Sequence, residues 1–115
     1  MNIEEYREFC LSLPHTTEDF PFDEEVLVFR VGGKIFSLTN INGFESINLK
    51  CDPERAVELR EQYDGIRPGY HMNKQHWNTI AMDGSVPNAL VRELVQHSYD
   101  LIFRSLPAKL RQQLG

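Results

Sequence analysis

Two short apolar segments in the first half of the chain meet at a pair of glycines. The segments Val26–Val31 and Lys34–Thr39 are separated only by Gly32 and Gly33. A two-residue connection between antiparallel strands requires positive φ angles, and glycine adopts these without the steric cost that other residues meet. The pattern therefore predicts a β-hairpin, and any fold of this chain has to contain an antiparallel sheet.

Regular pairing across this turn predicts which side chains share a face of the hairpin. It places Phe29 opposite Phe36 and Leu27 opposite Leu38, on a face that we expect to enter the core. The other face is mixed and is expected to be partly exposed. It carries Val26, Val28, Arg30, Ile35, Ser37 and Thr39.

The segments around the hairpin have helix and strand patterns in turn. Apolar residues at three- and four-residue steps predict a helix from Ile3 to Leu13, which Pro14 ends. Asp52 followed by Pro53 is typical of a helix start, with an N-cap carboxylate and proline at the first helical position. The other expected elements are a strand over Ser46–Lys50, a strand over Trp77–Met82, a helix over Pro87–Ser105 and a short helix from Pro107 to Gly115; segments 15–25 and 65–69 are expected to be loops, the first with room for a short edge strand.

This order of elements predicts a single α+β domain over residues 1–115, with helices packed on one face of an antiparallel sheet. No run of 18 apolar residues is present, so we expect no membrane partner. The first residues lack the basic and apolar regions of a signal peptide. Cys10 and Cys51 have no paired spacing and fit reduced thiols, so we expect a cytoplasmic protein.

Charge is distributed unevenly along the chain. The formal net charge is −5, and residues 1–25 hold eight acidic side chains against Arg7. Between Gly65 and Met82 there is no carboxylate, although cations are present. An acidic protein is a poor ligand for a polyanion, but a segment without carboxylates leaves room for a local anion site.

Residues 67–77 hold the densest cluster of functional side chains, including the only tryptophan and two of the four histidines. In a nucleic-acid site, basic side chains contact phosphates and aromatic side chains pack against sugars or bases. The residues that would do so here are Arg67, Tyr70, Asn73, Lys74 and Trp77.

Three other interpretations of this segment stay open. A metal site would use His71 and His76, but no Cys, Asp or Glu lies between them and they are not spaced along one helix face. A catalytic site would use a histidine as a base, but no nucleophile motif or carboxylate pair accompanies it. In a purely structural interpretation Trp77 anchors the core, the histidines are polar bridges, and Asn73 and Lys74 form a turn.

Three residues outside this segment are assigned structural or solvent-exposed positions. Cys51 precedes a helix N-terminus, where a thiolate would be stabilised, but the favoured interpretation is a small apolar residue that closes a strand. Cys10 lies on the apolar stripe of the first helix and is expected in the core. His97 lies towards the polar side of the long helix and is expected to be solvated.

The segment Arg67–Thr79, with its His-Met-Asn-Lys-x-His-Trp core, resembles the MmcQ/YjbR family of small bacterial proteins. The similarity spans nearly the whole chain and includes Pro14, the central hairpin, Leu49–Cys51, Asp83–Pro87 and His97–Tyr99. The resemblance implies a CyaY-like (frataxin-like) α+β fold, with helices on one side of a twisted antiparallel sheet. It also implies DNA binding through a double-wing arrangement, in which hairpins approach the duplex.

We therefore expect a non-enzymatic protein that binds DNA through a local basic patch. The net charge is −5, and the hairpin carries only two cations, Arg30 and Lys34, so this binding should be weak and salt-sensitive. Phosphate contacts are expected from Arg30, Lys34, Arg67 and Lys74, with Tyr70, Asn73 and Trp77 shaping the surface. The alternatives are an adaptor or chaperone-like module that binds another protein through the exposed sheet face, and a small-ligand or metal site around His71 and His76. No cofactor is expected.

Overall fold

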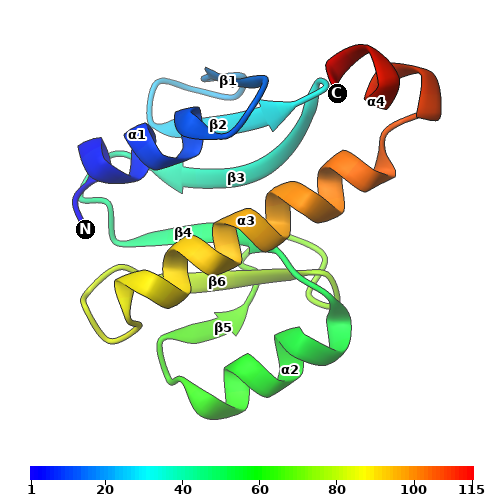
Figure 1. The fold of residues 1–115 in the computed structure, drawn as a ribbon. Helices are drawn as coiled ribbons and strands as arrows, with labels where there is room; N and C mark the ends of the chain where they lie inside the picture. Colours follow the sequence, from blue (N-terminus) through cyan, green and yellow to red (C-terminus); the bar gives the residue numbers. More distant parts are fainter.

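Six strands form one antiparallel sheet in the computed structural model, which describes residues 1–115 (Figure 1). The strand order is β1-β2-β3-β4-β6-β5, so only β5 lies out of chain order. The α+β class expected from the sequence is confirmed. The elements are α1 (Ile3–Ser12), β1 (Thr16–Asp19), β2 (Val26–Val31), β3 (Lys34–Asn40), β4 (Ser46–Lys50), α2 (Pro53–Gln62), β5 (Ile66–Pro68), β6 (Trp77–Ala81), α3 (Asn88–Ser105) and α4 (Ala108–Leu114).

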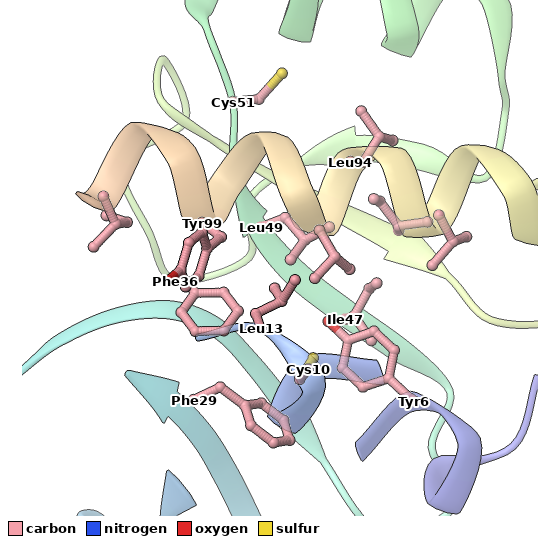
Figure 2. Close-up of a cluster of buried hydrophobic side chains, with 14 of the residues drawn as sticks. Tyr6, Cys10, Leu13, Phe29, Phe36, Ile47, Leu49, Cys51, Leu94 and Tyr99 are labelled. Atoms are coloured by element: carbon pink, nitrogen blue, oxygen red, sulfur yellow. The ribbon is translucent and has the colours of Figure 1, made fainter. Parts of the chain in front are cut away.

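The three longer helices cover one face of the sheet and leave the other face without a helix (Figure 1). Helix α3 crosses β3 and β4, α1 lies beside β1, and α2 packs against β5. None of these helices combines the length and the hydrophobicity needed to cross a bilayer. The core lies between the helices and the sheet. There the rings of Phe36 and Tyr99 pack edge to face with their centroids 5.3 Å apart, close to Tyr6 and Phe29 (Figure 2).

Local signals in the sequence explain where two helices begin. At α1, the Asn2 side chain accepts from the Glu5 backbone N–H at 2.8 Å while the Glu5 carboxylate accepts from the Asn2 N–H, which is a capping box. At α2, the expected N-cap residue Asp52 accepts from the Arg55 N–H at 3.2 Å, with Pro53 in the first turn. Both caps satisfy backbone donors that the helix leaves unpaired.

The hairpin forms at the expected turn, but its predicted register is wrong beyond the first two pairs. Moving away from the turn, Arg30 pairs with Ile35 as expected. The residue before it, Phe29, pairs with Ser37 rather than Phe36. Phe36 is therefore an extra residue on β3, which makes a β-bulge. Its carbonyl accepts from the Ser98 hydroxyl of α3 at 2.6 Å, so the polar group that the bulge leaves out of the ladder is satisfied by a helix.

The bulge changes which side chains of β3 enter the core. Phe36 and Ser37 are both fully buried, and Thr39 is 1% exposed. Leu38, expected in the core, pairs with Val28 on the face without helices. The buried Ser37 hydroxyl shares a 2.6 Å hydrogen bond with the hydroxyl of Tyr6.

The edges of the sheet also differ from the sequence expectation. Segment 65–69 is not only a loop, because Ile66–Pro68 forms β5 and pairs with β6. Tyr63 is the C-cap of α2 and is only partly buried. The short edge strand allowed for in segment 15–25 is present as β1.

Candidate functional site

One row of side chains runs straight across the sheet face that no helix covers. The register pairs neighbours along this row in the order Asp19, Val28, Leu38, Asn48, Thr79 and Arg67, one residue from each strand. The middle of the row is apolar and amide-bearing, and only its two ends are charged. Leu38, Asn48 and Thr79 form the floor of a cavity of about 560 Å³, which we call the sheet groove.

Two aromatic side chains from separate loops wall the sheet groove. Phe22 comes from the β1–β2 loop and Tyr70 from the β5–β6 loop, and their exposed fractions are 66% and 70%. Single exposed apolar side chains are common, but two aromatic side chains gathered at one cavity form an apolar patch that marks a candidate contact site. The apolar lining is Phe22, Val26, Leu38, Tyr70 and Met72, and the polar lining includes Asn40, Ser46, Asn48 and Thr79.

The β5–β6 loop folds back over the sheet because its base is held close to β6. The Gly69 N–H donates to the Trp77 carbonyl at 2.8 Å, and a Cβ at position 69 would lie 2.9 Å from the Trp77 Cβ. Only glycine fits so close an approach. One residue later, the Tyr70 N–H donates to the Thr79 hydroxyl at 3.0 Å, and that hydroxyl donates to Asn48 Oδ1 at 2.5 Å. Tyr70 is therefore positioned by the groove floor itself.

Asn73 and Lys74, expected to contact nucleic acid, stabilise this loop. The Asn73 side chain accepts from the backbone N–H groups of Gln75 and His76 at 2.9 and 3.3 Å. Lys74 Nζ donates to the Gly69 carbonyl at 2.9 Å, which closes the loop. The turn that the structural interpretation expected at these residues is therefore present.

His71, in the wall of the groove, has a backbone conformation that side chains rarely adopt. Its φ is +56°, and its ring centroid lies 4.0 Å from that of Tyr70. Non-glycine residues with positive φ are uncommon, and backbone strain of this kind concentrates at functional sites. The conformation keeps the Tyr70–His71 pair beside the groove.

The cations expected to form a basic patch each have a partner within the chain. Arg30 forms an ion pair with Asp19 at 2.8 Å, and its guanidinium also donates to the Gly33 carbonyl. Lys34 Nζ lies 3.4 Å from the carbonyl and the hydroxyl of Ser105, at the end of α3. Arg67 Nε donates to the Asp64 carbonyl at 3.4 Å.

Carboxylates surround Arg67 in the folded protein. The sequence between residues 65 and 82 contains no carboxylate, so these groups come from other segments of the chain. The pocket around Arg67 is lined by Glu45, Asp64 and Asp83. Asp64 and Asp83 flank the segment without carboxylates, and Glu45 precedes the paired strand β4. The folded surface at Arg67 is therefore acidic.

Comparison with known proteins identifies the family. The YjbR family model matches residues 11–101, most of the chain. The chain belongs to the YjbR family. The resemblance noted at Arg67–Thr79 is thus confirmed, and in this YjbR protein that segment forms β5, β6 and the loop that walls the sheet groove.

Relatives of known sequence and structure cover nearly all of this YjbR protein. It is 39% identical to YbdF of Escherichia coli O157:H7 over 87% of this chain and 83% of YbdF, and 31% identical to YjbR of Escherichia coli strain K12 over 99% and 98%. The crystal structure of Deinococcus radiodurans DR2400 has a TM-score of 0.94 at 42% identity, covering 99% of this chain and 88% of that one. A Pseudomonas syringae protein has a TM-score of 0.75 at 30% identity, covering 89% and 99%.

The two histidines considered as metal ligands have different environments in the YjbR fold. His71 lines the sheet groove, whereas His76 is half-buried and its carbonyl accepts from the Cys51 N–H at 2.8 Å. No group of three or more His, Cys, Asp or Glu side chains is arranged to hold an ion. His71 is therefore part of the groove lining, and His76 is not.

Both thiols are buried and unreactive in character. Burial raises the pKa of Cys10 to about 12 and that of Cys51 to about 11, although Arg55 opposes the shift at Cys51. The thiolate is the nucleophilic form, so neither thiol is activated at neutral pH. The structural interpretation of both cysteines agrees with this burial.

The sequence predicted a solvated His97, but the structure gives this side chain a partner within the chain. Its Nε2 accepts from the Asp52 backbone N–H at 3.1 Å and so joins α3 to the start of α2. Burial is the largest cause that lowers the pKa of His97, and Arg55 adds to it. His97 is therefore held neutral as a structural acceptor.

Sequence reasoning missed most of the groove. Tyr70 and His71 were singled out, but Phe22, Leu38 and Asn48 were not. The alternation in Ser46–Lys50 indicates that Asn48 points away from the core. Two phenylalanines in an acidic loop, Phe20 and Phe22, were the other available signal.

Proposed function

We propose that this YjbR protein is a non-enzymatic interaction module that holds a segment of another protein in the sheet groove. The observation that carries the proposal is the floor of Leu38, Asn48 and Thr79 on the face without helices, walled by exposed Phe22 and Tyr70. It corresponds to the adaptor alternative that the sequence left open.

The chemistry of the lining supports a peptide as the occupant. Exposed aromatic side chains act as anchors in protein interfaces because they bury a large area at low entropic cost. The amides of Asn40 and Asn48 can both donate and accept, as the N–H and C=O groups of a peptide backbone require. A volume of about 560 Å³ is sufficient for a few side chains.

The proposal is tested by selecting random peptides on the intact protein and measuring their affinity by fluorescence polarisation. Phe22→Ser and Tyr70→Ser should each weaken binding about tenfold, the loss typical of an aromatic anchor. Val57→Ser is the matched control, because Val57 is an apolar side chain that is 49% exposed on α2. It should leave affinity unchanged.

The single tryptophan provides an independent readout. Trp77 is partly exposed on β6, two residues before Thr79 and on the same face of the sheet. A peptide in the groove should change its fluorescence, with a midpoint equal to the polarisation Kd. If no selected peptide loses affinity in either groove variant, the proposed function is wrong.

Weak duplex-DNA binding is a second candidate, favoured by one observation. Arg30 and Lys34 lie on either side of the Gly32–Gly33 turn, where two cations from one hairpin could contact a phosphate backbone. Their contacts with Asp19 and Ser105 compete with phosphate. This candidate would show a log–log salt slope of about −0.9 per phosphate neutralised, reduced by about one unit in Lys34→Ala. An Asp19→Asn variant, which frees Arg30, should tighten such binding.

A further inference from the structure

We propose that the segment bound in the sheet groove is basic, with a Lys or Arg next to the bulky apolar side chain that fits between Phe22 and Tyr70. This inference rests on the proposed function and names the chemistry of its partner.

The groove itself has no charged lining. Its titratable side chains are His71 and Tyr70, and the rest are apolar, hydroxyl or amide groups. Selection by charge must therefore arise at the ends of the groove, where a bound segment continues beyond the floor.

One end of the groove is acidic. The register brings Val26 opposite Asn40 and Ser46 opposite Ala81, at the same end of the sheet. The Glu25 carboxylate lies 3.5 Å from the Asn40 side-chain amide, which lines the groove. On the next strand Glu45 directly precedes Ser46. Both carboxylates are exposed at this end.

An acidic pocket continues from this end of the groove. The pocket and the groove share Ser46 and Thr79, so the two cavities adjoin. Its charged lining is Glu45, Asp64 and Asp83 against Arg67. The ion pairs within the chain are Arg7–Glu18, Arg30–Asp19 and Arg55–Glu93, so the pocket carboxylates have no cation partner.

Arg67 is the cation in the lining of the acidic pocket, and the other cations of this face lie farther from it or have partners. Lys50 shares the face of Asn48 but lies at the end of β4 opposite Ser46. Arg30 lies towards the other end of β2 and is paired with Asp19. Lys74 Nζ is held by the Gly69 carbonyl within the β5–β6 loop. A segment leaving the groove at the Ser46 end therefore meets an excess of negative charge, which favours Lys or Arg and disfavours Asp, Glu or phosphate.

The peptides selected on the intact protein supply the first test. Sequences that bind should be enriched in Lys or Arg adjacent to Phe, Leu, Met or Trp, and replacing the basic residue with Gln should weaken binding. Affinity should fall as salt is raised, because exposed charges are screened. Enrichment of acidic or uncharged peptides would overturn the inference.

Charge variants of the protein supply the second test. Glu45→Gln with Asp64→Asn removes two pocket carboxylates whose side chains make no hydrogen bond in the structure, and should weaken a selected basic peptide about fivefold. Glu54→Gln with Glu58→Gln is the matched control, because it removes the same charge from exposed positions of α2. The control should leave affinity unchanged.

The two levels of the proposal fail in different ways. If peptides lose affinity in Phe22→Ser but bind equally well to the pocket variant and at high salt, the groove is a binding site and its preference for basic segments is wrong. If the pocket variant weakens binding while Phe22→Ser and Tyr70→Ser do not, the peptides bind outside the groove and both conclusions are wrong.

Discussion

The Ser98 hydroxyl on α3 donates to the Phe36 carbonyl of β3 at 2.6 Å and accepts from the Lys50 N–H of β4 at 3.0 Å. One fully buried side chain thus satisfies two backbone groups from different strands. Ser98→Ala leaves both groups unpaired and should lower the free energy of unfolding by about 2 kcal/mol. Urea denaturation measures this loss, and Ser12→Ala on the exposed face of α1 should cost much less. An equal loss in the two variants would contradict the role of Ser98.

The buried hydrogen bond between Tyr6 and Ser37 is testable by a double-mutant cycle. Desolvation is the main cause that raises the pKa of Tyr6, so its hydroxyl stays protonated and paired at 2.6 Å. Tyr6→Phe leaves the Ser37 hydroxyl unpaired and should cost about 1–2 kcal/mol. The double variant with Ser37→Ala should be more stable than the sum of the single losses predicts. Strict additivity would show that the two hydroxyls are not coupled.

Thr79 links the β5–β6 loop to the floor of the groove. Thr79→Val removes both the hydrogen bond to Asn48 and the acceptor of the Tyr70 N–H. We expect faster hydrogen exchange at the Tyr70 amide and a loss of about 1 kcal/mol in stability. Thr79→Ser, which keeps the hydroxyl, should retain most of the protection. Unchanged Tyr70 exchange in Thr79→Val would mean that the loop is held by its base alone.

The stability of the protein should fall as pH falls below about 6.5, the ordinary pKa of histidine. Because the pKa of His97 is lowered in the folded state, the unfolded chain binds a proton at a higher pH, and protonation favours unfolding. Arg55 and Arg104 oppose the charged form, while Asp52 and Asp100 favour it less effectively than burial opposes it.

Comparing unfolding at pH 7.5 and 5.5 (~2 pH units apart, a range in which ordinary carboxylates stay ionised) checks this dependence. His97→Gln keeps an acceptor for the Asp52 N–H without titrating, so its stability should change less with pH. A slope in His97→Gln equal to that of the unchanged protein would assign the pH dependence to other groups.

The two glycines of the hairpin turn should differ in their tolerance of alanine. Both have positive φ, +58° at Gly32 and +84° at Gly33, so either substitution costs about 1 kcal/mol of backbone strain. A Cβ at Gly32 would also lie 2.5 Å from a methyl carbon of buried Leu106, whereas a Cβ at Gly33 meets open space. Gly32→Ala should therefore be clearly less stable than Gly33→Ala in urea. Equal losses of stability would show that the Leu106 side chain moves aside without lowering the free energy of unfolding.

Much of the fold could be predicted because its signals are local. Asp52 and Pro53 marked the start of α2, and Gly32 with Gly33 marked the hairpin turn. The bulge at Phe36 has no such marker, because adjacent apolar residues such as Ile35 and Phe36 also occur in regular strands. It depends on Ser98, which is remote in the sequence and supplies a partner for the displaced carbonyl.

The candidate site was harder to predict than the fold. Residue types identified Arg30, Arg67 and Lys74 as candidate contacts, but the chain alone could not show that each cation has a partner of its own. The groove depends on the pairing of Leu38 with Asn48 and on a loop that returns over the sheet. Both are tertiary features that a one-dimensional pattern does not contain.

The extra residue at Phe36 also determines to which face of the sheet each later side chain of β3 points. Deleting one residue there would restore the straight hairpin, and the side chains from Ser37 to Asn40 would exchange sides. Leu38 would then enter the interior, and two hydroxyl residues would replace it at the surface. Homologues able to use this surface in the same way should therefore preserve the length of β3 even where its individual residues diverge.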